Sequence, residues 1–148
     1  MSRGIRVLDL ASLWACALWW GSLSTIGFLV VPMLFVHLPS PALAGAMAAK
    51  LFTAQSWVSL CCGLALLMLS RRGASPGRAN GLSQAMLFIT GGVLLALLLE
   101  LAVAPRIVAR DHLALWHRVG TGMYVLQWLC AGLTFWTLTK NRTTEGEC

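Results

Sequence analysis

AVAPRIVARDHLALWHRVG, residues 102–120, is the stretch that decides the fold, because it separates two long apolar runs. It holds three arginines, one aspartate and two of the three histidines of the chain. The runs beside it are long enough to cross a bilayer, whose ~30 Å hydrocarbon core takes about 20 residues of helix. The sequence therefore predicts a small membrane protein that crosses the bilayer several times.

The composition favours the same class. The 148 residues are 58% hydrophobic and 11% charged, with a mean hydropathy of +0.77, whereas soluble domains carry roughly 25% charged residues. The net charge of +6 is concentrated at the ends of the apolar runs, where it orients membrane proteins. We therefore expect the lipid bilayer as the main partner and no nucleic acid.

The predicted organisation is an all-α, integral membrane bundle of four transmembrane helices. The first apolar run is about twice as long as the core of a signal peptide, so we expect it to be retained as a helix. Short connections make consecutive helices antiparallel neighbours, which gives an up-down bundle. The predicted segments are a basic lead over 1–9, a transmembrane domain over 10–139 with helices at about 10–38, 41–69, 83–104 and 113–138, and a polar, disordered tail over 140–148.

The distribution of lysine and arginine predicts the orientation. The lead, the 70–82 loop and the tail carry seven such residues. The opposite side carries two, or four when Lys50 and Arg118 are included. Because positive residues accumulate on the cytoplasmic side, we expect both termini in the cytoplasm. The expected location is the inner (plasma) membrane of a bacterium.

Several short motifs follow one another along the chain. They are Trp20-Gly21, Pro32-Met33-Leu34-Phe35, Leu51-Phe52, Pro105-Arg106-Ile107 and Trp116-His117-Arg118. With this order and spacing, residues from about 10 to 138 resemble the bacterial membrane domain grouped with eukaryotic transmembrane protein 205. The resemblance implies a four-helix membrane protein of uncharacterised activity. The eukaryotic relatives are associated with resistance to platinum drugs, and that link reaches this chain only by analogy.

Two ionisable residues, Lys50 and Glu100, fall inside or at the edge of apolar runs. Charged side chains there are costly, usually face the bundle interior and are functional candidates. Both lie toward the outer ends of their predicted helices, where a pairing would lower the cost of burying each. The alternatives are a structural role, in which each side chain extends to the interface, and a proton- or ion-handling role.

All three histidines, His37, His112 and His117, fall on the predicted outer side, near Arg106 and Arg118. Imidazole ligates transition metals, which makes the histidines metal candidates. The pair His37 and His117, from different helices, is the candidate for a cofactor site. His112 and His117 are five residues apart and do not share a helical face. Hydrogen bonding at the interface is the alternative for each.

Other polar residues carry weaker signals. The vicinal pair Cys61-Cys62 suits soft metals such as Cu(I), although helix packing is the simpler interpretation. Arg106 and Arg110, four residues apart, are candidates for contacts with headgroup phosphates or another anion, and a solvated helix edge is the alternative.

No catalytic motif is present in the sequence, and no cofactor is predicted, with a metal or haem as the alternative. The leading hypothesis is a non-enzymatic accessory or small-solute/metal-handling membrane component. Small residues spaced four apart, such as Gly45 and Ala49, favour association into a homo-oligomer or a larger complex. The alternatives are a metal- or haem-binding redox enzyme that uses the outer histidines, and a proton-coupled small transporter that uses Glu100.

Overall fold

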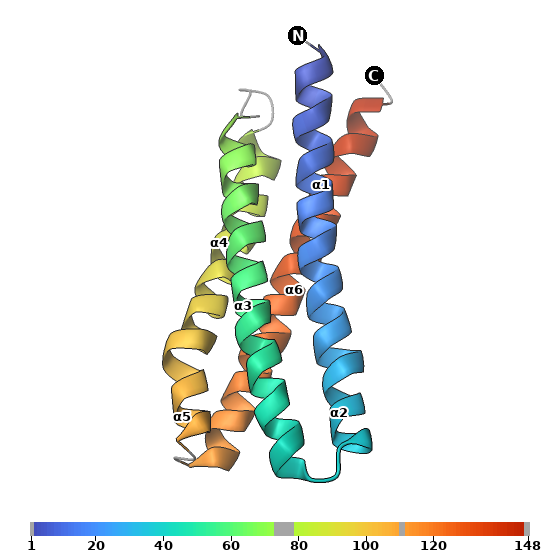
Figure 1. Cartoon of the computed structure of the whole chain (residues 1–148). Helices are drawn as coiled ribbons and strands as arrows, with labels where there is room; N and C mark the ends of the chain where they lie inside the picture. Colours follow the sequence, from blue (N-terminus) through green and yellow to red (C-terminus); the bar gives the residue numbers. More distant parts are fainter. Residues whose placement is uncertain (1, 73–78, 110–111, 147–148) are drawn as a thin grey trace.

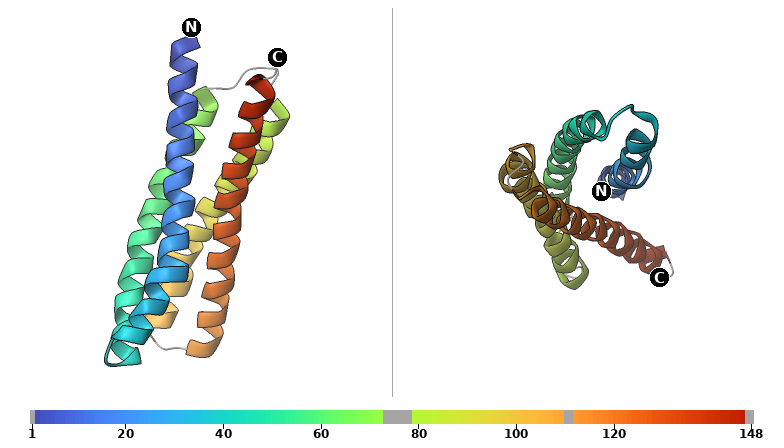
Figure 2. Two further views of the ribbon diagram at one scale, coloured as in Figure 1. Left: turned by 90° about the vertical axis from the view of Figure 1, so that its right-hand side faces the viewer. Right: turned by 90° about the horizontal axis from the view of Figure 1, so that it is seen from below.

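The computed structural model describes residues 2–72, 79–109 and 112–146, and every described element is helical. The prediction of an all-α bundle is confirmed. The elements form four antiparallel arms (Figure 1), each a continuous helical segment, which span residues 2–37, 41–72, 79–108 and 113–146. The first arm begins and the fourth arm ends at the same end of the bundle, the terminal end. At the opposite end, the far end, α2 leads into α3 and α5 leads toward α6. The view along the bundle in Figure 2 shows the arms side by side.

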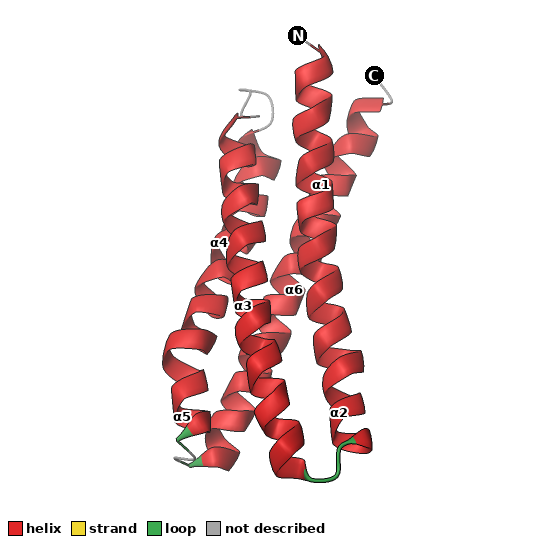
Figure 3. Ribbon diagram, in the orientation of Figure 1, coloured by secondary structure: helices red, strands yellow, loops and turns green. Residues whose placement is uncertain are grey.

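The elements have these bounds: α1 Ser2–Ser24, η1 Thr25–Val30, α2 Val31–His37, α3 Pro41–Arg72, α4 Ala79–Leu98, η3 Leu99–Val103, α5 Ala104–Val108 and α6 Leu113–Gly146. The neighbouring pairs are α1 with α3, α3 with α4, α4 with α6 and α6 with α1. The arms thus form a ring in which α3 and α6 lie diagonally opposite. Figure 3 shows the loop that joins α2 to α3 at the far end.

Three stretches are long and apolar enough to cross a membrane, namely Val7–His37, Pro41–Arg71 and Gln84–Val108. The described part of α6 is long enough, but its hydropathy is lower than that of these three stretches. Its middle carries an amide at Gln127, a phenol at Tyr124 and several threonines, and these groups lower its hydropathy. The chain therefore has the helix lengths and the hydropathy of a membrane protein, and its fourth arm is the most polar.

The first and third arms are interrupted by π-helical turns. In each arm the π turn comes just before a proline, η1 before Pro32 and η3 before Pro105. Proline has no N–H, and its ring clashes with the carbonyl four residues earlier. A wider π turn relieves that clash and keeps the helix continuous. The sequence predicts one helix over 10–38, whose apolar run only Pro32 breaks, and another over 83–104, so the π turns themselves are new findings.

Helix ends also differ from the predicted boundaries. The helix α1 begins at Ser2, so the described part of the basic lead is helical, and the third arm continues past residue 104 to Val108. The helix α6 continues past residue 138 to Gly146, so residues 140–146 of the predicted disordered tail are helical. The physical reason is continuity, because nothing before Gly146 breaks the helix. Residues 147–148 lie outside the described residues.

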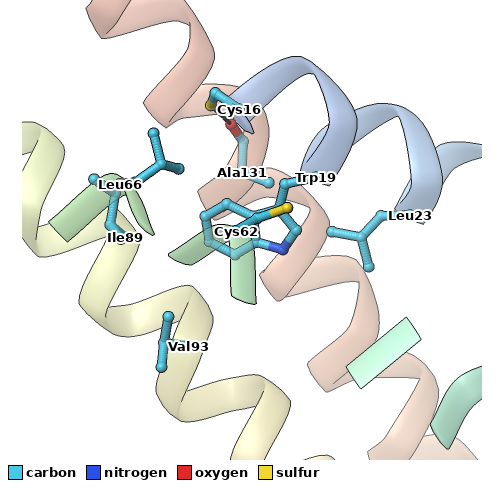
Figure 4. Packing of buried hydrophobic residues seen from close by; sticks show 8 residues of the cluster. All are labelled: Cys16, Trp19, Leu23, Cys62, Leu66, Ile89, Val93 and Ala131. Atoms are coloured by element: carbon cyan, nitrogen blue, oxygen red, sulfur yellow. Dashed lines mark hydrogen bonds between the residues drawn. The ribbon is translucent and has the colours of Figure 1, made fainter. Parts of the chain in front are cut away.

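The core lies around Trp19, which is fully buried between the arms (Figure 4). Its indole ring lies against Gly92 of α4, where a Cβ would stand 2.6 Å from a ring carbon of Trp19. Only glycine allows this approach. The other buried members of the core cluster are Cys16, Leu23, Cys62, Leu66, Ile89, Val93 and Ala131.

Candidate functional site

The polar residues singled out in the sequence lie toward the far end and mostly on the surface of the bundle. Lys50, Arg118 and His117 are exposed, and Glu100 is half-buried in η3. The predicted pairing of Lys50 with Glu100 stays a prediction. Because Lys50 and Arg118 are exposed, they lie on the outside of the bundle, as expected for long cationic side chains that extend to the membrane interface.

The histidines have local contacts. The ring N–H of His37 at Nδ1 donates to the carbonyl of Met33, 2.9 Å away on the same helix. His112 is exposed and has a positive φ of 42°, and its carbonyl accepts the backbone N–H groups of Leu115 and Trp116 at the start of α6. The described residues contain no group of three His, Cys, Asp or Glu side chains arranged to hold a metal ion. The site of His37 with His117 stays a prediction.

The vicinal cysteines have different surroundings, because Cys61 is exposed and Cys62 is buried. Two consecutive helical residues point about 100° apart, which accounts for this difference. The thiol of Cys16 is also buried, and it donates a weak hydrogen bond to the carbonyl of Ala131 at 3.7 Å. Cys16 and Cys62 are thus part of the packed core.

Among the described residues, the buried polar side chains are amides and hydroxyls, and none of them is charged. Gln55 on α3 and Gln127 on α6 are each 2% exposed. The Gln55 Nε2 group donates to the hydroxyl of Ser22 on α1 at 3.0 Å and to that of Ser59 at 3.3 Å. The Ser22 hydroxyl donates in turn to the carbonyl of Trp19 at 3.0 Å. These bonds join α3 to α1 through side chains.

Gln55 and Gln127 lie at the same level of the bundle. Phe52 on α3 and Tyr124 on α6 pack edge to face, with ring centroids 5.2 Å apart. Both helices start at the far end, and each glutamine follows its aromatic residue by three positions. Each amide therefore lies ~4.5 Å beyond that ring contact. We define the buried amide site as Gln55, Gln127, Ser22, Ser59 and Trp19.

Several polar atoms in this region lack a hydrogen-bond partner. They are Oε1 of Gln55, Nε2 of Gln127 and Nε1 of Trp19, together with Nε1 of Trp20 at the edge toward α6; among the described residues none of them finds a donor or acceptor. A buried amide without a partner costs several kcal/mol in an apolar medium. The site therefore presents one free acceptor and two free donor groups around the bundle centre.

A second set of contacts closes the bundle between this site and the far end. The Tyr124 hydroxyl donates to the carbonyl of Leu23 at 2.8 Å, and the indole N–H of Trp128 donates to the hydroxyl of Ser24 at 2.8 Å. Gly27, inside η1, makes room for the tyrosine, because a Cβ there would stand 2.6 Å from the ring. These contacts fasten α6 to the first arm where its helix changes to the π form.

Sequence reasoning did not select Gln55 or Gln127. The sequence predictions selected charged residues and histidines. Charged residues inside a bilayer have a high free-energy cost, so neutral amides form an interior site at a lower cost. The signal that finds them is an isolated amide in the middle of an apolar run, a residue type that bonds across membrane helices. The segments LFTAQSWVSL and MYVLQWLC contain two of the three glutamines of the chain.

The long apolar helices and their antiparallel packing define a multi-span type of membrane protein. The chain belongs to the family described as a domain of unknown function (DUF4149), which matches residues 14–115. That range includes Ser22, Gln55 and Ser59, whereas Gln127 lies beyond it. No curated protein and no solved structure matches the chain. The resemblance to the transmembrane protein 205 group stays a prediction.

Proposed function

We propose that this protein is a non-enzymatic membrane component that takes a small, neutral, polar solute into the buried amide site. The observation that carries the proposal is the pair Gln55 and Gln127, each 2% exposed and each with an unpartnered amide atom. Gln55 offers an acceptor, and Gln127 and Trp19 offer donors. A guest with both a donor and an acceptor satisfies these groups together.

The chemistry of the site favours an uncharged guest. Every member is an amide, a hydroxyl or an indole, and none carries a charge that would compensate an ion. An unpaired ion in a medium of low polarity costs far more than a neutral polar group. Hydroxylic or amide-like small molecules, of which glycerol and urea are the simplest probes, have the required donors and acceptors.

The proposal includes the placement of the chain. We infer that α6 crosses the bilayer as a fourth span, that both termini are cytoplasmic, and that the membrane is the inner membrane of a bacterium. The support is that α6 packs beside two of the apolar spans and that the terminal end carries most of the basic residues. We also propose that the chain is related to the transmembrane protein 205 group and that it self-associates through its small residues.

The alternatives have less support. A redox enzyme would need ligands that face one another, whereas His37 and His117 are exposed and His37 bonds within its own helix. A proton-coupled transporter that uses Glu100 would need an aqueous path to that half-buried carboxylate.

The test is solute flux into proteoliposomes, measured by stopped-flow light scattering with glycerol and urea as probes. The variants are Gln55→Leu and Gln127→Leu, and the matched control is Gln84→Leu, which makes the same change at an exposed position near the start of α4. We expect the wild type and Gln84→Leu to exceed protein-free liposomes for at least one probe, and the two buried variants to lose that excess. Wild-type flux equal to that of protein-free liposomes for both probes would refute the proposal.

A further inference from the structure

Arg106 and Trp116 form a stacked pair at the far end. The guanidinium carbon of Arg106, on α5, lies 4.5 Å from the centroid of the Trp116 ring, on α6. Arg106 is exposed and Trp116 is half-buried. The pair thus joins the short helix α5 to the start of α6 and leaves the cation accessible.

The contact with Trp116 restricts the position of the arginine and leaves its hydrogen-bond donors available. The guanidinium carbon lies over the Trp116 ring, an attraction typical of arginine over tryptophan. The N–H groups lie in the guanidinium plane and point away from its edge, where they match two oxygens of a phosphate. A lysine in this position would bring the charge without the planar fork.

The position of the pair along the helix indicates the depth at which it lies. The apolar stretch Gln84–Val108, long enough to cross a membrane, places Arg106 two residues before its end. Arginine and tryptophan at the end of a span lie at the level of the lipid headgroups. The same arm exposes Leu98 and Leu101, by 51% and 73%, and these side chains, which lie deeper in the span than Arg106, provide an apolar surface for acyl chains.

We infer that the Arg106–Trp116 pair binds the headgroup phosphate of an anionic phospholipid. An anionic lipid fits better than a zwitterionic one because the described residues toward the far end include Lys50, Arg106 and Arg118 against a single acid, Glu100. A zwitterionic headgroup brings its own ammonium group, which would face this excess of positive charge. This site lies on the surface and does not depend on the buried amide site.

The test is lipid binding by the full chain in detergent, measured by native mass spectrometry with phosphatidylglycerol and with phosphatidylcholine. The variants are Arg106→Gln, which removes the cation, and Arg106→Lys, which keeps the charge and removes the fork. The matched control is Arg71→Gln, which removes an exposed arginine near the terminal end. All of these positions are exposed, and size-exclusion chromatography checks that each variant is folded.

We expect Arg106→Gln to weaken phosphatidylglycerol binding at least about fivefold, Arg106→Lys to weaken it less, and Arg71→Gln to leave it unchanged. Binding of phosphatidylglycerol by Arg106→Gln at the wild-type level would overturn the inference. So would equal binding of the two lipids by the wild type. Displacement of the bound lipid by inorganic phosphate at millimolar concentration would reassign the site to a free anion and would also overturn it.

Discussion

A pair of neighbouring glycines in α4 tests the packing that places Trp19 in the bundle interior. A Cβ added at Gly92 would stand 2.6 Å and 2.8 Å from two ring carbons of Trp19, whereas one added at Gly91 would meet nothing closer than the Cys130 sulfur at 3.9 Å. Favourable carbon contacts lie at about 3.5–4.0 Å. Trp19 is fully buried, so a shift of its ring away from Gly92 would disturb the side chains packed around it.

The magnitude follows from comparing Gly92→Ala with Gly91→Ala. Both variants gain about 1 kcal/mol from the better helix propensity of alanine, and this gain cancels in the comparison. Overpacking of a core costs about 1–3 kcal/mol and applies at Gly92 alone. We therefore expect the free energy of unfolding of Gly92→Ala to be about 1–3 kcal/mol lower than that of Gly91→Ala.

The assay is reversible unfolding by sodium dodecyl sulfate in mixed micelles, followed by tryptophan fluorescence. Gly91→Ala should equal or exceed the wild type, and Gly92→Ala should fall below Gly91→Ala. Equal stability of the two variants would mean that the Trp19 ring does not rest on α4. The placement of its indole N–H in the buried amide site would then be wrong.

Three further predictions concern the contacts between α6, the first arm and its π turn. Tyr124→Phe removes the bond to the Leu23 carbonyl and should lower the free energy of unfolding by about 0.6 kcal/mol, a typical value for such bonds in membrane proteins; an unchanged value would show that the bond contributes nothing. Gly27→Ala should destabilise the wild-type protein, in which Tyr124 occupies the space of the added Cβ. The same substitution should destabilise the Tyr124→Leu variant much less, so a double-mutant cycle should give a coupling energy of at least about 0.5 kcal/mol. Gly21→Ala, which has open space around its Cβ, is the control. Pro32→Ala restores an N–H donor and should slow amide hydrogen exchange across Thr25–Val31, and faster exchange there would contradict the account of the π turn.

Much of the fold could be predicted because it follows from properties local to the sequence. Apolar length identifies the arms, and the two prolines around Ser40 end one helix and begin the next, at His37 and Pro41. The π turns could not be predicted, because a proline inside an apolar run is compatible with a kink, a break or a wider turn. The choice depends on neighbours such as Tyr124, which packs on Gly27 from the other end of the chain.

The candidate site was harder to predict for a different reason. Charged residues and histidines are easily recognised in a sequence, and the predictions therefore selected Lys50, Glu100 and the histidines. In the structure these residues are exposed or half-buried near the far end. The shared level of Gln55 and Gln127 depends on the register of two helices that are diagonal in the bundle and distant in the chain. That register is fixed by tertiary contacts such as the Phe52–Tyr124 ring pair, which no local pattern reveals.

The most direct test of the central claim uses the fact that the chain has only three glutamines, Gln55, Gln84 and Gln127. Protein labelled with ¹⁵N at the glutamine side chains, in lipid nanodiscs, gives one pair of amide signals for each residue, assigned with the leucine variants. On titration with glycerol or urea, we expect the signals of Gln55 and Gln127 to shift together and to saturate, while those of exposed Gln84 stay in place or drift linearly. Unchanged signals from both buried glutamines would contradict a polar solute site in the bundle.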